Sequence, residues 1–273
     1  MRIVLIITAL FISGLAHAQY FNEAMARQDS TYQNLKKKII HEFKHASPGK
    51  FGPFVKGVDE DINTNQKILA LTFDACGGPH GSGYDEELIN FLRQEKIPAT
   101  LFLSGLWIDA NPDKVKELAA DPLFEIENHG LTHHPCAIDG ETKFGIKGTS
   151  GVNQAVDEIE LNARKIEWMT SFKPLYYRSA TATTDEGCST IAHHLNETIV
   201  SYDLLSGDAV SGTPKGVIKE NLVRGAKDGA IVIMHMNHPE WNGYEALKEA
   251  LPAWQAQGFT FVKLNMHPLK GKH

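Results

Sequence analysis

The residues best suited to chemistry are acids, imidazoles and an arginine scattered through the middle of the chain. Asp74, Asp208 and His235 have side chains that can accept or donate a proton, and Arg178 carries a positive charge. Taken singly, an Asp or Arg of this kind is more often a turn former or a solvated charge. Together they are the side chains that metal-assisted acid/base chemistry uses, provided that the fold brings them to one place.

A pair of histidines, His129 and His133, lies in the segment Asn128-His129-Gly130-Leu131-Thr132-His133-His134-Pro135. In one helical turn, a spacing of four residues brings two imidazoles to the same side, close enough to share a divalent metal such as zinc. The Glu of the H-E-x-x-H motif is missing, so a zinc-protease site does not follow. Each imidazole would also need an acceptor that holds its second nitrogen.

The elements that must position these residues alternate along the chain. Short apolar runs rich in β-prone residues predict strands at Ile68–Phe73, Ala99–Leu103, Phe124–Glu127, Leu175–Tyr177, Thr198–Tyr202, Ala230–Met236 and Phe259–Leu264. Amphipathic stretches between them predict helices at Asp85–Glu95, Pro112–Ala120, Val152–Met169, Gly187–Leu195, Pro214–Lys227 and Gly243–Gln257. This alternation predicts an α/β fold with a parallel, barrel-like sheet rather than separate domains.

In barrels of this kind the reacting groups lie just past the carboxyl ends of the strands. Asp74 follows the first predicted strand, and His129 and His133 follow the third. Arg178 follows the fourth strand, and Asp203 and Asp208 follow the fifth. His235 lies near the end of the sixth strand. These side chains are therefore expected on one face of the barrel. Trp241 follows the same strand as His235 and is predicted to contact the substrate, whereas other large aromatics are expected in the core.

The chain divides into three segments. Residues 1–18 are typical of a secretory signal, with Arg2 before an apolar run and a small-x-small cleavage site at Ala16-His17-Ala18, so export is expected. The run is shorter than the roughly 20 residues that span a bilayer, and no stable membrane insertion is expected after cleavage. Residues 19–66 are predicted to form a helical extension and connector, and residues 67–273 the barrel domain. The net charge of −6 argues against nucleic acid as the main partner.

In this order and spacing, the residues resemble the polysaccharide deacetylase family, also called carbohydrate esterase family four or the NodB-homology domain. The resemblance spans about Ile68 to Leu264. Its motifs are Thr72-Phe73-Asp74, His129 with His133, Tyr177-Arg178-Ser179-Ala180, Ser206-Gly207-Asp208-Ala209 and Ile233-Met234-His235. It implies a distorted (β/α) barrel of about seven strands, a divalent metal that is often zinc, and hydrolysis of acetyl groups on an acetylated glycan such as peptidoglycan or a chitin-like polymer.

The resemblance also implies a role for each catalytic residue. Asp74 would be the general base for the attacking water, and His235 the general acid for the departing nitrogen or oxygen. Arg178 would keep Asp74 ionised and aimed. Asp208 would orient His235 and raise its pKa.

The largest departure from the family pattern is Ala75, which stands where the family has a metal-binding Asp. The two histidines would then need a third ligand, since catalytic zinc sites usually have three protein ligands and a water. Three candidates remain open: Asp74 itself, Asp85, and His80 on the glycine-rich loop between them.

Two further departures are Ala209, in place of a Trp, and the missing Pro after the Arg178 motif. They leave two alternatives open beside the glycan deacetylase. The domain could be a non-catalytic relic that has lost its metal and only binds glycan, or it could hydrolyse a small non-sugar amide.

The three cysteines allow one disulfide in an oxidising compartment. Cys76 and Cys136 border two of the predicted site motifs, so a bond between them is one hypothesis. A thiolate that binds metal is the alternative. Cys188, at a predicted helix start, is expected to be a small buried apolar residue.

Overall fold

A computed structural model describes residues 21–271, so the predicted signal at residues 1–18 lies outside the described part of the chain. The main sheet has nine strands in the order β12-β13-β4-β5-β6-β9-β11-β2, with β14 beside the first half of β4. All of its pairs are parallel. The strands are β2 (Val58–Asp59), β4 (Ile68–Ala75), β5 (Ala99–Leu103), β6 (Phe124–Asn128), β9 (Tyr176–Tyr177), β11 (Thr198–Val200), β12 (Leu204–Leu205), β13 (Ile231–His235) and β14 (Thr260–Val262).

The expected barrel-like α/β fold is confirmed, and all seven expected strands are present. The sequence did not reveal the two-residue strands β2 and β12, because neither lies in a longer apolar run that would separate it from a loop. Short antiparallel pairs complete the structure: β1 (Phe51–Gly52) with β10 (Thr184–Asp185), β3 (Asp61–Ile62) with β15 (Leu269–Lys270), and β7 (Thr142–Lys143) with β8 (Ile146–Lys147).

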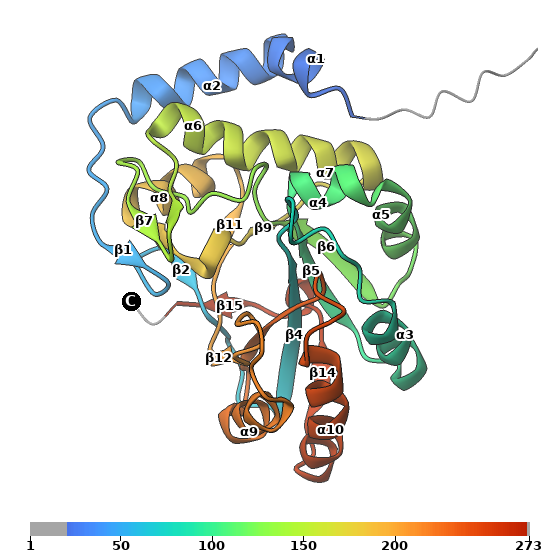
Figure 1. Ribbon diagram of the computed structural model, residues 1–273. Coiled ribbons are helices and arrows are strands. Elements are labelled where there is room, and N and C mark those ends of the chain that lie inside the picture. Colours follow the sequence, from blue (N-terminus) through green and yellow to red (C-terminus); the bar gives the residue numbers. More distant parts are fainter. Residues whose placement is uncertain (1–20, 272–273) are drawn as a thin grey trace, which may run out of the picture.

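The helices lie around the outside of the curved sheet, with α1 and α2 forming an extra layer over α6 and α7 (Figure 1). They are α1 (Glu23–Gln28), α2 (Ser30–Glu42), α3 (Glu86–Glu95), α4 (Gly105–Ala110), α5 (Pro112–Ala119), α6 (Val152–Val156), α7 (Asn162–Thr170), α8 (Glu186–His194), α9 (Lys215–Gly225) and α10 (Gly243–Ala256). A π-helical segment, Asp157–Leu161, joins α6 to α7. Within residues 21–271, no helix is both long enough and apolar enough to cross a membrane.

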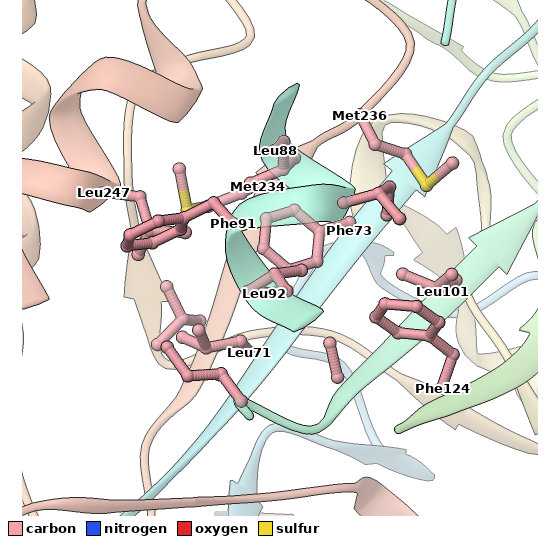
Figure 2. Packing of buried hydrophobic residues seen from close by; sticks show 14 of the residues in the cluster. Leu71, Phe73, Leu88, Phe91, Leu92, Leu101, Phe124, Met234, Met236 and Leu247 are labelled. Carbon is pink, nitrogen blue, oxygen red and sulfur yellow. The ribbon is translucent and has the colours of Figure 1, made fainter. Parts of the chain in front are cut away.

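Strand β4 lies at the centre of the sheet and is buried along its whole length. Successive side chains of a strand point to opposite faces, so each face receives every second residue. Leu71 and Phe73 pack against α3, which contributes Leu88, Phe91 and Leu92 to the main core (Figure 2). Of the alternate residues of β4, Ile68 and Ala70 belong to a second apolar cluster inside the barrel.

The carboxylate of Asp157 contacts both N-terminal helices and helps to fix them to the barrel. Asp157, in the π-helical segment, pairs with Arg27 at 2.7 Å and accepts hydrogen bonds from Tyr32 and Lys36. Burial alone raises the pKa of Asp157, but these three partners outweigh it and hold the pKa below its usual value. Apolar packing adds to these contacts of Asp157, since the side chains of Tyr32 and Ile39 of α2 are buried.

We expect Asp157→Asn to lower the free energy of unfolding at pH 7 by about 1–3 kcal/mol, because charged hydrogen bonds are lost. The carboxyl has a lower pKa folded than unfolded. Its stabilising contribution is therefore present above its unfolded pKa of about 3.9 and is lost as the pH falls through the folded value. Urea unfolding from pH 7 downward should show the difference from wild type shrinking in acid.

Asp113→Asn is the matched control, because Asp113 is almost fully exposed beside Lys116. It should leave the unfolding midpoint within error at every pH. A constant difference between the Asp157 variant and wild type across this pH range would contradict the ionic role of Asp157.

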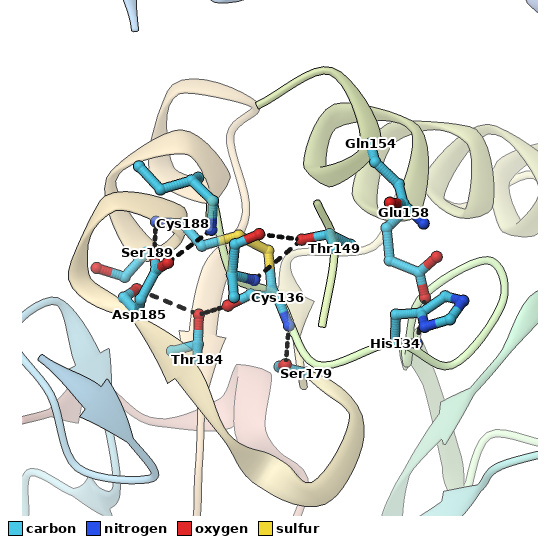
Figure 3. The surroundings of a disulfide bond; sticks show 12 residues. His134, Cys136, Thr149, Gln154, Glu158, Ser179, Thr184, Asp185, Cys188 and Ser189 are labelled. Carbon is cyan, nitrogen blue, oxygen red and sulfur yellow. Dashed lines mark hydrogen bonds between the residues drawn. A yellow bond between two sulfur atoms is a disulfide. The ribbon is translucent and has the colours of Figure 1, made fainter. Parts of the chain in front are cut away.

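The hypothesis of a Cys76–Cys136 disulfide is wrong. Cys188 is buried among apolar residues, as expected, but it is part of the disulfide. Cys136 bonds to Cys188, with Cα atoms 5.8 Å apart, and this bond joins the loop after β6 to the start of α8 (Figure 3). Hydrogen bonds of the Cys136 backbone explain why its disulfide partner is Cys188. The Cys136 amide donates to Ser179 Oγ at 2.8 Å, and its carbonyl accepts from Thr184 Oγ1 at 2.9 Å, so the residue is held beside α8. Cys76 is left as a free thiol.

We expect the denatured, unreduced protein to react with a thiol reagent at Cys76 alone, and at all three cysteines after reduction. Reduction should lower the free energy of unfolding by about 2–4 kcal/mol, because it releases a long closed loop in the unfolded chain. Peptide mass mapping and urea unfolding with and without reductant measure the two effects. Labelling of Cys136 or Cys188 before reduction would contradict the pairing.

Candidate functional site

Asp74 and Arg178 form a buried ion pair inside the barrel. Asp74 is on the inward face of β4, and its Oδ1 accepts from Arg178 Nη1 at 2.8 Å. The guanidinium also donates to Thr72 Oγ1 and to the carbonyls of Val200 and Ser201. Burial favours the neutral form of Asp74, but the charges of Arg178 and the nearest imidazoles outweigh it and keep the pKa of this carboxyl below its usual value. The barrel thus holds an ionised carboxylate in a fixed direction.

His129 follows β6 and is held in one tautomer. Its Nδ1 lies 2.8 Å from the carbonyl oxygen of Arg178, which can only accept, so Nδ1 carries the proton. In the neutral ring this leaves the lone pair on Nε2. That atom lies 3.7 Å from Asp74 Oδ2 and 3.7 Å from Cys76 Sγ. Burial lowers the pKa of His129, but Asp74 and the Cys76 thiol more than offset this and raise it.

His133 lies beside His129, with ring centroids 4.9 Å apart. The predicted proximity is therefore present, but the predicted helical turn is not. The segment is an irregular loop in which Gly130 and His133 have positive φ angles of 84° and 58°. His133 Nε2 is buried and has no hydrogen-bond partner in the part of the chain that the structure describes.

Glu158, in the π-helical segment, organises this loop, and sequence reasoning missed it. Its buried carboxylate accepts from the amides of Thr132 and His134 and from Thr132 Oγ1, at 2.6 to 3.1 Å. Figure 3 shows it pointing from the helix toward His134. An acid on the buried side of a predicted helix is the only signal the sequence offered, and its partners could not be read from it.

His235, at the end of β13, pairs with Asp208. Its Nδ1 lies 3.0 Å from Asp208 Oδ1, and its backbone amide donates to Oδ2 at 2.8 Å. Burial lowers the pKa of His235, but the charge and hydrogen bond of Asp208 outweigh this and raise it well above the usual value. Ser206 Oγ donates to the same carboxylate at 2.8 Å and helps to orient it. These contacts therefore favour the protonated form of the imidazole.

Three groups next to the ion pair could hold a metal ion. Cys76 Sγ and a ring nitrogen of each of His129 and His133 lie within 4.8 Å of one another. The lone pair of His129 and the unpartnered nitrogen of His133 are what a coordinated cation requires. The residues present therefore fit a divalent metal. Burial opposes ionisation of Cys76, but the neighbouring imidazoles, first of all His133, outweigh it and hold the thiol pKa well below its usual range.

The other two candidate ligands lie elsewhere. Asp85 caps α3, where its side chain accepts from the Leu88 amide at 2.9 Å, and burial raises its pKa to about 6. His80 is exposed. The loop that carries it is tied down, since Asn237 donates to the Gly81 carbonyl at 2.9 Å, instead of folding over the histidines.

A cavity of about 630 Å³ opens over these groups. Its lining includes Asp74, Cys76, His129, His133, His235 and Trp241. Trp241 stacks on His238 with centroids 3.5 Å apart and the rings nearly parallel, which forms a flat aromatic wall. Arg178 and Asp208 do not line the cavity themselves. Each contacts a residue that does, Arg178 contacting Asp74 and Asp208 contacting His235. Asp203, by contrast, pairs with Lys227 at 2.7 Å outside this cavity.

Comparison with known proteins agrees with this architecture. The polysaccharide deacetylase family model matches residues 61–200, just over half of the chain. A peptidoglycan-N-acetylglucosamine deacetylase from Bacillus cereus is 26% identical over 218 residues, which cover 78% of this chain and 93% of that protein.

Two solved structures share the fold. PdaA from Bacillus subtilis, a family 4 carbohydrate esterase, has a TM-score of 0.64 and 19% identity, and the match covers 85% of this chain and 87% of that one. A family 4 pseudoenzyme from Bacillus anthracis has a TM-score of 0.62 and 22% identity, with 74% and 66% covered. On the family match, the chain belongs to the polysaccharide deacetylase family.

Proposed function

We propose that the protein is an exported, metal-dependent hydrolase that removes acetyl groups from a glycan. The observation that carries the proposal is the convergence of two paired groups, Asp74 with Arg178 and His235 with Asp208, on one cavity. One pair keeps a carboxylate ionised and the other keeps an imidazole protonated. The likeness to a peptidoglycan-N-acetylglucosamine deacetylase favours an N-acetylated sugar of peptidoglycan as the substrate.

In the proposed mechanism, Asp74 accepts a proton from the water that attacks the acetyl carbonyl. His235 donates a proton to the departing nitrogen or oxygen, so that the acetyl group leaves as acetate. Arg178 and Asp208 are positioning residues, since each acts through the partner that it orients. Trp241 offers a flat apolar face on which a sugar ring could stack.

His129 and His133 would hold the divalent metal. When bound, such an ion polarises the carbonyl and stabilises the charge that develops on its oxygen. The donors are imidazoles held by backbone and loop contacts, so the site is preorganised.

Export is supported by the Cys136–Cys188 disulfide, because such bonds form and persist mainly in oxidising compartments. The predicted signal at residues 1–18 points the same way. The substrate would then be a glycan outside the cytoplasm, without stable insertion of the protein in a membrane.

A non-catalytic, glycan-binding relic is the competing function. Ala75 at the family's ligand position and the similarity to a pseudoenzyme motivate it. The retention of both charge pairs around one cavity favours the enzyme, because buried charges are costly to keep without a use. Hydrolysis of a small non-sugar amide is the other alternative, and it needs the same residues.

We expect the purified protein to contain about one zinc per chain and to release acetate from acetylated chito-oligomers or peptidoglycan. Chelation should abolish release, and added zinc should restore it. His235→Asn should lower kcat by about 10²–10⁴-fold, the usual contribution of a general acid or base. His41→Asn, at an exposed helix position, is the matched control and should retain full activity.

Acetate release from small amides but not from glycans would favour the alternative substrate. Sugar binding without metal, and without release after zinc is supplied, would favour the relic.

We expect Arg178→Ala to destabilise the fold by about 3–5 kcal/mol, because the buried Asp74 carboxylate loses its partner. Adding Asp74→Asn to this variant should recover part of the loss, since no unpaired charge then remains. Arg224→Ala, which breaks an exposed pair with Glu220, is the control and should change the urea midpoint little. No recovery in the double variant would contradict the ionic coupling.

A further inference from the structure

We infer that Cys76 is the third protein ligand of the metal, so that the site is a Cys-His-His centre. The assignment depends on the metal requirement of the proposed function and adds to it the identity of the donor set. Its basis is the cluster formed by Cys76, His129 and His133, in which the three donor atoms lie within 4.8 Å of one another.

In this chain residue 76, and not residue 75, offers a donor to the histidines. Ala75 is the last residue of β4, and its methyl group packs in the main core, on the side of the sheet that the helices cover. Ala75 has no donor atom and does not line the cavity. Asp74 and Cys76 are two residues apart and point to the same side, so both line the cavity.

The backbone around Cys76 is fixed on both sides. Ser104 donates from its amide to the Ala75 carbonyl at 3.1 Å and from Oγ to the Cys76 carbonyl at 2.6 Å. Beyond it, Gly77 has φ +75°, and a Cβ there would come within 2.5 Å of the Trp107 amide. The thiol is therefore held in place by its neighbours.

The spacing of the donors suits a metal. Bonds of about 2.3 Å to sulfur and 2.0–2.1 Å to nitrogen, at a tetrahedral angle, place the two atoms about 3.5 Å apart. Cys76 Sγ and His129 Nε2 are 3.7 Å apart. With His133, these donors make three protein ligands, which leaves a fourth position open toward the cavity, as catalytic zinc sites require.

The rival third ligands are engaged or distant. Asp85 caps α3 and His80 is exposed. Asp74 is nearer, but its Oδ1 is taken by Arg178, and its carboxylate is not one of the donor atoms that lie within 4.8 Å of one another. Assigning the third ligand to Cys76 leaves this carboxylate free to act as the base.

A thiolate ligand also determines which metal ions the site prefers. Soft sulfur donors select zinc over magnesium, calcium or manganese, which prefer oxygen ligands. The centre should therefore bind zinc or cobalt(II), and excess Mg²⁺ or Ca²⁺ should not displace them.

Cobalt(II) substitution tests the ligand directly, without any activity measurement. The metal-free protein, loaded with one equivalent of Co²⁺, should show the intense near-ultraviolet charge-transfer band of a cobalt–thiolate bond. Cys76→Ser should lose this band and weaken zinc binding by more than about 100-fold, because even the loss of a group that only supports a ligand costs about 10–100-fold. Cys76→Asp should bind zinc more tightly than Cys76→Ser but should show no band.

Thiol reactivity gives a second readout, because Cys136 and Cys188 are joined and Cys76 is the free thiol. Alkylation of Cys76 should be fast in the metal-free protein, blocked by zinc and restored by chelation. His80→Ala is the control and should leave the band, the zinc affinity and the protection unchanged.

Stoichiometric cobalt binding without the band, with Cys76 still reactive in the zinc-loaded protein, would overturn the assignment and leave the proposed function intact. Failure of both wild type and variants to bind zinc or cobalt would overturn the metal-dependent function and the ligand assignment together.

Discussion

Strand β4 is buried on both faces, and the two faces have opposite requirements. The face toward α3 must be apolar, and it carries Leu71, Phe73 and Ala75. The inward face carries Asp74, whose charge is tolerated only because Arg178 reaches across the barrel to meet it. A shift of one residue in the register of β4 would exchange the two sets, so the packing of the core fixes the direction of the Asp74 carboxylate.

Each buried charge of the site is held by a partner from another strand. Arg178 follows β9 and pairs with Asp74, and Asp208 follows β12 and pairs with His235 of β13. Asp74 and His235 are thereby driven to opposite charge states, since Arg178 favours the ionised carboxylate and Asp208 the protonated imidazole. Such pairs cost stability through desolvation, and their retention in one cavity is better explained by chemistry than by folding.

Alternation of apolar residues was enough to predict the fold, because the longer strands and the helices of a parallel barrel have distinct periods. It also predicted that Asp74, Arg178 and His235 share one end of the barrel. It could not predict contacts made by loops. The His129–His133 segment is shaped by Glu158 from a distant helix. The disulfide partner of Cys136 lies 52 residues away, and no local pattern encodes either contact.

The three cysteines differ in environment rather than in type. Cys136 and Cys188 face each other between a loop and a helix start, away from ionisable partners that could hold a thiolate. Cys76 continues the inward face of β4 and meets imidazoles instead. Because the other two cysteines of the chain are bonded to each other, Cys76 has no partner left within the chain for a disulfide. The structural disulfide therefore leaves available the residue that we assign to the metal, and the proposed export is compatible with a cysteine ligand.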